Sequence, residues 1–181
     1  TKMEKGLFDY DDLLQLVEEQ VNPTRKKEIT TLTKVVREKY ACAVVDEFQD
    51  TDHRQWNIFR NIFLESPEHS IVLIGDPKQA IYSFRGADIF TYMQAKRIFE
   101  ENFSHAPVSL TKNFRSSELL LCGLNHIFGS KYWFPEEGEL SYTNVGCGKP
   151  ELELKDHTSN RSAVHLLEII PQFTVSGKKL A

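Results

Sequence analysis

The chain has 181 residues, of which 40% are hydrophobic and 27% are charged, and its formal net charge is −4. This composition is that of an ordinary globular protein with a hydrophobic core, and it excludes a disordered or fibrous chain. The acidic balance also excludes a basic field over the whole surface, although an acidic body can still bind DNA in a local groove.

The spacing of apolar, capping and turn residues predicts alternating helices and strands. In chain order these are helices at 8–19 and 30–39, a strand at 41–45, a helix at 53–64, a strand at 71–74, a helix at 88–101, a strand at 107–110 and a helix capped by Ser116 or Ser117. The strands at 41–45 and 71–74 are continuous apolar runs, which are typical of strands buried on both faces.

The apolar stripes of the predicted helices indicate which residues face the core. These are Tyr10, Leu13, Leu14 and Val17 in the first helix, Leu32, Val35 and Val36 in the second, Trp56, Phe59 and Phe63 in the third, and Leu120, Leu124 and Ile127 in the last. Beyond Gly129 the pattern is weaker, and it predicts strands at 152–154 and 164–170 within a second, incomplete domain.

Strands that alternate with helices over such short connections predict an α/β fold built from parallel βαβ units. In open sheets of this kind, ligands bind beyond the carboxyl ends of the strands. That rule selects the segments 46–50, 75–79 and 111–115 as the candidate functional site.

The cysteines and the apolar runs indicate the compartment. Cys42, Cys122 and Cys147 are odd in number and far apart, so they form neither a CxxC pair nor a disulfide framework. No apolar run approaches the roughly 18–20 residues that a membrane helix needs. We therefore expect a cytoplasmic protein without a membrane segment.

Two carboxylates, Asp46 and Glu47, directly follow the strand at 41–45. Acids at such a place are costly unless they hold a cation or have separate tasks. Mg²⁺ prefers one or two carboxylates together with waters and phosphates. Asp46 is thus placed to hold Mg²⁺ and Glu47 to deprotonate a water, while the alternative is a pair of solvated acids that cap the next helix.

A second segment, which begins at Gly75 after the strand at 71–74, combines polar and aromatic residues. The neutral amide of Gln79 can hydrogen-bond a phosphate or a water. Tyr82 and Phe84 alternate with the cation Arg85, and such rings stack on bases of single-stranded nucleic acid. The alternative is that both rings belong to the core.

The third segment, Asn113-Phe114-Arg115, follows the predicted strand at 107–110. An arginine beside a helix N-terminus suits a phosphate, because its planar guanidinium donates two parallel hydrogen bonds. The alternative is a surface salt bridge.

Together these segments resemble motifs II, III and IV of the UvrD/Rep-like superfamily 1 helicases, in the same order. They read Asp-Glu-Phe-Gln-Asp from Asp46, Gly-Asp-Pro-Lys-Gln-Ala-Ile-Tyr-Ser-Phe-Arg-Gly-Ala from Gly75, and Asn-Phe-Arg-Ser-Ser from Asn113. Within the family, the stretch 75–92 is similar to the RecB (exodeoxyribonuclease V beta) branch, since Phe84 stands where other branches carry tryptophan. The resemblance implies a partial RecA-like sheet of the P-loop NTPase fold at 1–111, and the start of a second motor domain at 112–181.

The resemblance also implies roles in ATP hydrolysis. Asp46 would bind Mg²⁺, Glu47 would act as the general base, and Gln79 would sense the γ-phosphate. Phe114 would stack on adenine, and Arg115 would be the finger that reaches the γ-phosphate. The implied cofactors are ATP and Mg²⁺.

For nucleic acid, the resemblance implies that Tyr82 and Phe84 stack on single-stranded DNA and that Arg85 links the DNA groove to the nucleotide. The implied parent is an ATP-dependent 3′→5′ helicase and exonuclease subunit of double-strand break repair and recombination. Its implied partners are DNA, including duplex ends, and RecC-like and RecD-like subunits.

No Gly-x-x-x-x-Gly-Lys-Ser/Thr loop occurs in the sequence, and that loop cradles the phosphates of ATP in such motors. We therefore expect an internal piece of a longer protein that by itself hydrolyses ATP negligibly. One alternative is a non-catalytic phosphate- or protein-binding module that retains the fold. Another is a metal-dependent nuclease centred on Asp46, Glu47 and Asp50, which leaves Gln79 and Arg115 without a role.

Overall fold

The computed structural model describes residues 6–22, 29–81, 88–103, 107–130, 133–134, 140–150 and 164. The chain forms two compact units, Thr1–Pro107 and Val108–Ala181, and each unit is described by itself.

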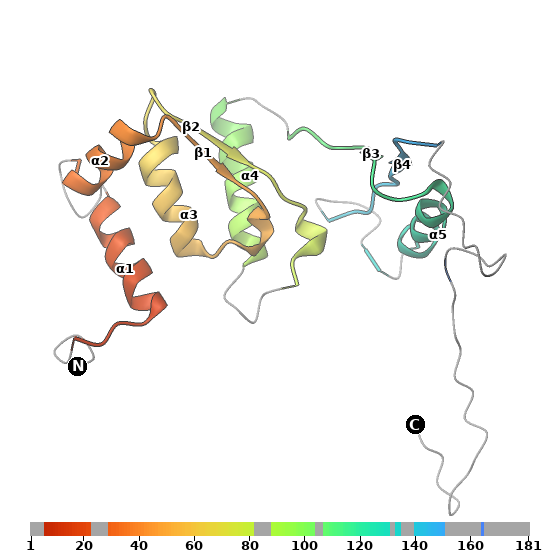
Figure 1. The fold of residues 1–181 in the computed structure, drawn as a ribbon, viewed down its shortest axis with the longest axis horizontal. Helices are drawn as coiled ribbons and strands as arrows, with labels where there is room; N and C mark the ends of the chain where they lie inside the picture. The colour runs from red at the N-terminus through yellow and green to blue at the C-terminus, as the bar shows by residue number, and fades with distance from the viewer. Residues whose placement is uncertain are drawn as a thin grey trace, which may run out of the picture. The chain divides into compact units, whose positions relative to one another are not determined.

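The first unit alternates helices with two short strands (Figure 1). In chain order its elements are α1 (Tyr10–Val21), α2 (Thr31–Lys39), β1 (Cys42–Val45), the 3₁₀ turn η2 (Phe48–Asp50), α3 (His53–Phe59), the π-helical turn η3 (Arg60–Leu64), β2 (Ser70–Leu73), the 3₁₀ turn η4 (Pro77–Gln79) and α4 (Ile89–Phe103). Side chains cap the first three helices, because Asp9, Thr30 and Asp52 each accept a hydrogen bond from a backbone N–H of the first turn.

Strands β1 and β2 pair in parallel, with Cys42 opposite Ser70 and Val45 opposite Leu73. The chain between them runs through η2, α3 and η3, so the predicted parallel βαβ unit is confirmed. The same pairing places the carboxyl ends of both strands at one edge, where 46–50 and 75–79 leave the sheet.

The core of the first unit lies on one face of this sheet. Its buried residues are Val21, Phe48, Trp56, Ile62, Phe63, Ile71 and Ala95. On the other face, Val44 is 65% exposed and Val72 47% exposed. The prediction that both strands are buried on both faces is therefore wrong for the described residues, because the described helices that pack on the sheet share the face of Ala43 and Ile71.

The predicted core stripe holds for α3 and only in part for α1 and α2, where Leu14 is half-buried and Val36 packs against the core. Trp56 is 1% exposed and Phe63 5% exposed, as predicted, whereas Tyr10 is 66% exposed and Leu13 52% exposed. Polar contacts also fix the outer helices. Asn57 Nδ2 donates to Glu18 Oε1 of α1 at 2.8 Å.

The predicted helix at 53–64 changes to a π-helical turn at Arg60. Two carbonyls of this turn, those of Asn61 and Ile62, accept hydrogen bonds from the Arg37 guanidinium at 3.0 and 2.7 Å. These bonds satisfy polar groups that would otherwise have no partner at the end of the helix, and they attach α2.

The second unit holds β3 (Lys112–Asn113), α5 (Glu118–Phe128) and β4 (Gly146–Cys147). Strands β3 and β4 pair in parallel, and Ser117 caps α5, as predicted. The predicted strand at 107–110 is wrong, because that segment is exposed and the strand begins at Lys112. On α5, Leu121 is buried, whereas the predicted Leu120, Leu124 and Ile127 are half-buried.

The predicted strands at 152–154 and 164–170 lie outside the described residues, apart from Val164. Across the part of the chain that the structure describes, no helix combines the length and apolar character needed to span a membrane.

Candidate functional site at the strand ends

Asp46 and Glu47 leave the end of β1 with exposed side chains. The Glu47 N–H donates to Asp46 Oδ1 at 2.9 Å. Glu47 is left-handed, with φ 50° and ψ 43°, and among the described residues no other non-glycine residue has a positive φ. This conformation costs about 1–2 kcal/mol in an L-residue, so surrounding contacts must hold it.

Those contacts come from the turn η2, which follows Glu47. The Asp50 N–H donates to the Glu47 carbonyl at 2.9 Å. Phe48 and Gln49 are each 2% exposed, and the Gln49 amide donates from Nε2 to Glu47 Oε2 at 2.7 Å. The backbone and the side chain of Glu47 are therefore both fixed, while its carboxylate stays at the surface.

The end of β2 is joined to the same turn. The Phe48 N–H donates to the Ile74 carbonyl at 2.9 Å, and the Asp76 N–H donates to Gln49 Oε1 at 3.0 Å. Gly75 makes this approach possible, because a Cβ at that position would lie 2.7 Å from Gln49 Oε1 and 3.0 Å from Phe48 N. The loops after β1 and β2 thus form one hydrogen-bonded structure.

Asp76 organises the turn that carries Gln79. Its Oδ1 accepts from the Lys78 N–H at 3.0 Å and lies 2.8 Å from Lys78 Nζ. Its Oδ2 accepts from Gln79 Nε2 at 3.3 Å. The exposed Gln79 amide is therefore hydrogen-bonded to Asp76, and the Asp76 backbone is hydrogen-bonded to Gln49.

Burial and hydrogen bonding act in opposite directions on Asp76. Burial alone raises the pKa of this carboxyl, but hydrogen bonds from Lys78 and Gln79 and the charge of Lys78 outweigh it and hold the pKa below its usual value. In Tyr92, burial first and then the negative charge of Asp76 raise the pKa of the phenol. Asp76 is therefore a carboxylate at neutral pH and Tyr92 a neutral hydrogen-bond donor.

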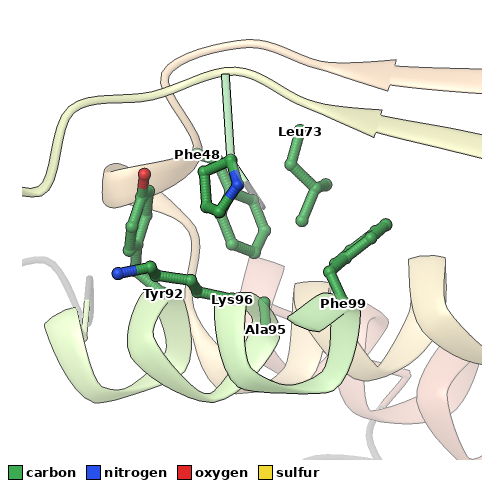
Figure 2. Close-up of a pocket in the computed structure, with 7 residues that line it drawn as sticks. Phe48, Leu73, Tyr92, Ala95, Lys96 and Phe99 are labelled. Carbon is green, nitrogen blue, oxygen red and sulfur yellow. The ribbon is translucent and has the colours of Figure 1, made fainter. Parts of the chain in front are cut away.

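Aromatic rings pack against the loops that follow β1 and β2. The Phe48 ring lies 5.5 Å from the Trp56 ring and 5.8 Å from the Tyr92 ring, and the Tyr92 hydroxyl donates to the Gly75 carbonyl at 3.3 Å. Figure 2 shows Phe48 between β2 and α4, beside an apolar pocket of about 180 Å³ lined by Phe48, Leu73, Tyr92, Ala95, Lys96, Phe99 and Pro107. The predicted catalytic side chains do not line this pocket, so it is not the predicted phosphate site.

Phe114 and Arg115 belong to the second unit, directly after β3. Asn113 Oδ1 accepts from the backbone N–H groups of Arg115 and Ser116, each at 2.8 Å. Phe114 is 58% exposed, and one side of its ring contacts Gly148, where a Cβ would lie 2.6 Å from the ring. Among the described residues no carboxylate forms an ion pair with Arg115, so the surface salt bridge that the sequence allowed is not formed within that part of the chain.

The structure brings Asp46, Glu47 and Gln79 to one sheet edge. A hydrated Mg²⁺ suits this donor set, because that ion needs only one or two carboxylates beside waters and phosphates. Within the described ranges no three acid, histidine or cysteine side chains form a group that could hold a metal ion. The predicted DNA-contacting residues Tyr82, Phe84 and Arg85 lie outside the described residues.

Gln49 and Tyr92 contribute to the site but were not predicted from the sequence to do so. The burial of Gln49 has no signal in the sequence, because a glutamine between Phe48 and Asp50 is equally compatible with an exposed turn. Tyr92 sits in the predicted helix at 88–101, but the contact between its hydroxyl and Gly75 joins positions that are distant in the chain.

Comparison with known proteins gives a consistent family. Residues 1–100 match the model of the UvrD/REP helicase N-terminal domain. The RecBCD enzyme subunit RecB of Escherichia coli (strain K12) is 41% identical over 127 residues, which are 70% of this chain and 10% of that protein. The RecB subunit of Haemophilus influenzae is 45% identical over 121 residues, which are 66% of this chain and 9% of that protein.

The chain thus spans about a tenth of the length of these relatives. The family model covers more than half of the chain, and the two strand-end loops that carry motifs II and III lie inside the matched region. The chain therefore belongs to the UvrD/REP helicase family.

Proposed function

We propose that this chain is part of the motor of an ATP-dependent 3′→5′ DNA helicase and exonuclease subunit of the RecB type, which acts in double-strand break repair and recombination. The observation that carries the proposal is the direct joining of the two loops at the carboxyl ends of β1 and β2. A phosphate site needs groups from neighbouring strand ends held rigidly together. The exposed carboxylates of Asp46 and Glu47 and the amide of Gln79 meet that need.

In the proposed reaction, Asp46 would hold a hydrated Mg²⁺, which when bound would supply charge neutralisation for the phosphates of ATP. Glu47 orients the attacking water and takes its proton, because its carboxylate is exposed and yet fixed by Gln49 at 2.7 Å. Gln79 hydrogen-bonds the γ-phosphate. Gln79 Nε2 carries two N–H groups, so it can donate one to a phosphate while the other stays on Asp76 Oδ2 at 3.3 Å.

Phe114 and Arg115 supply the remaining ATP contacts in this proposal. The exposed Phe114 ring stacks on the adenine, and the Arg115 guanidinium stabilises charge on the transferred phosphoryl group. We assign residues 1–111 to the first motor domain, a partial RecA-like sheet of the P-loop NTPase fold, and 112–181 to the start of the second.

The DNA contacts are proposed from the sequence, since Tyr82, Phe84 and Arg85 lie outside the described residues. Rings that alternate with a cation stack on successive bases without regard to base identity. This segment lies between the turn that carries Gln79 and the start of α4, so the proposal links DNA contacts to the ATP site through a short stretch of chain. The proposed partners are RecC-like and RecD-like subunits. The proposed location is the cytoplasm.

Replacing Glu47 with glutamine in the full-length protein that carries this sequence tests the proposal. Glu47→Gln keeps the shape and removes the base, so DNA-stimulated ATP turnover should fall about 10²–10⁴-fold. Binding of a fluorescent ATP analogue should persist. The matched control is Glu65→Gln, which removes a surface acid paired with Arg60 at 2.9 Å and should leave turnover unchanged.

Two results would contradict the assignment. If nucleotide affinity fell as steeply as turnover, Glu47 would be a binding ligand and not the base. If neither changed, ATP hydrolysis by the full-length protein would not depend on Glu47, and a non-catalytic module would be the better description of this chain.

A further inference from the structure

Gln49, the fourth residue of motif II, uses both ends of its side-chain amide. Gln49 is 2% exposed, donates from Nε2 to Glu47 Oε2 at 2.7 Å and accepts at Oε1 from the Asp76 N–H at 3.0 Å. These partners fix the orientation of the amide, because a carboxylate can only accept and a backbone N–H can only donate. A flipped amide would oppose two acceptors on one side and two donors on the other.

Burial of Gln49 restricts its side chain to this hydrogen-bonded conformation. A buried glutamine loses side-chain freedom and must satisfy both polar ends to offset its desolvation. The Glu47 bond has a charged acceptor and is short, which places it among the stronger hydrogen bonds. Gly75 leaves the space that Oε1 occupies, since a Cβ at that position would lie 2.7 Å from this oxygen.

We propose that Gln49 is a positioning residue that holds the Glu47 carboxylate and ties it to the Gly75–Asp76 turn. This inference rests on the proposed function of Glu47 as the general base. A base misplaced by about 1 Å can cost about 100-fold in rate, so a buried anchor on an otherwise exposed side chain has a direct catalytic use.

The left-handed backbone of Glu47 supports this role. Conformations of this kind persist only where the surroundings over-determine them, and they concentrate at functional sites. Here the Asp46 carboxylate fixes the Glu47 N–H, and Gln49 fixes the far end of the side chain. A capping role would need the Glu47 side chain to accept from a backbone N–H of η2, and it makes no such bond.

The turn to which Gln49 is anchored also carries Gln79. Asp76 gives its N–H to Gln49 and accepts from the Gln79 side chain through Oδ2 at 3.3 Å. The Tyr92 hydroxyl of α4 donates a hydrogen bond to the Gly75 carbonyl of the same turn at 3.3 Å. A displacement of this turn, at the phosphate sensor or at α4, therefore moves Gln49 and with it the base.

Gln49→Met in the full-length protein tests the inference, because methionine has a similar length and makes neither hydrogen bond. We expect kcat for DNA-stimulated ATP hydrolysis to fall about 10–100-fold. KM for ATP should stay within about threefold, since Gln49 does not touch the nucleotide. The matched control is Gln55→Met, which removes a half-buried glutamine that accepts from the Asp52 N–H at 3.2 Å at the start of α3, and it should leave kcat unchanged.

The double variant with Glu47→Gln separates positioning from structure. When the base is absent its anchor has nothing to position, so Gln49→Met should lower the residual kcat by less than about threefold. A further fall as large as that of the single variant would mean that Gln49 only stabilises the fold, and would overturn the inference. Unchanged kcat in Gln49→Met alone would overturn it as well.

A second variant covers the case in which Gln49→Met fails to fold. Gln49→Asn keeps the amide but shortens the side chain by one methylene, so it cannot reach both Glu47 Oε2 and the Asp76 N–H. The same loss of kcat is expected, and wild-type kcat would overturn the inference. If Glu47→Gln itself leaves turnover intact, the proposed function fails separately, whatever the Gln49 variants do.

Discussion

Replacing Gly75 with alanine perturbs the point where the two strand-end loops are closest. The added Cβ would lie 2.7 Å from Gln49 Oε1, 3.0 Å from Phe48 N and 3.2 Å from Gln49 N. Two of these three atoms belong to the backbone, so they cannot move away by a change of side-chain rotamer. The loops must therefore either bear the overlap or separate.

Both routes have a defined cost. Bearing the overlap costs about 1–3 kcal/mol, as in other overpacked sites. Separation breaks the hydrogen bonds from Phe48 N to Ile74 O and from Asp76 N to Gln49 Oε1, at about 1 kcal/mol each. Alanine regains about 0.4–1 kcal/mol by restricting the unfolded chain. The net loss in the free energy of unfolding is therefore about 1–2 kcal/mol.

Urea unfolding followed by far-UV circular dichroism measures this loss. Gly146→Ala is the control, because its Cβ would meet only the Thr111 carbonyl at an ordinary 3.6 Å. That variant should keep or slightly raise the free energy of unfolding through the same effect on the unfolded chain. Equal stability of the two variants would refute the close approach of the loops at Gly75.

The left-handed φ of 50° at Glu47 predicts that Glu47→Gly unfolds with about 1 kcal/mol more free energy than Glu47→Ala. Both variants lose the bond to Gln49, so equal urea midpoints would show that the backbone there is unstrained. The lowered pKa of Asp76 stabilises the fold above the unfolded pKa of about 3.9, and this contribution is lost as pH falls through the folded value. In Lys78→Met, NMR titration should show the pKa of Asp76 rise. The stability difference from wild type, less than about 1 kcal/mol because the pair is partly exposed, should vanish in acid, and a difference that persists there would exclude this pair as its source.

The local features of the fold were predictable because they depend on neighbours in the chain. A cap such as Asp52 or Ser117 acts on the next turn of backbone, so its sequence position fixes the helix start. Two apolar runs joined by a helix likewise predict a parallel pair, and β1 and β2 form one. The expectation that ligand-binding groups gather beyond these strand ends selected 46–50 and 75–79, which the structure joins by hydrogen bonds.

Features that depend on distant contacts were not predictable. A continuous apolar strand is compatible with one covered face or with two, and only the packing of α3 and α4 shows that Val44 and Val72 are exposed. The exposed segment 107–110 has the composition of a strand, but the strand that pairs with β4 begins at Lys112. The burial of Gln49 likewise depends on Gly75, which lies beyond the whole of α3 and β2 in the chain.

Three hydrogen bonds in series join the proposed base to the proposed phosphate sensor. Glu47 is bound by Gln49, Gln49 by the Asp76 N–H, and Asp76 Oδ2 by Gln79, at 2.7, 3.0 and 3.3 Å. The longest bond is the one between Asp76 and the proposed sensor Gln79, and the shortest is the one that holds the base. Of the three hydrogen bonds, the one between Asp76 and Gln79 is therefore expected to break first. Nucleotide can engage Gln79 at little cost while Glu47 stays in place, and only a larger movement of the turn reaches the base.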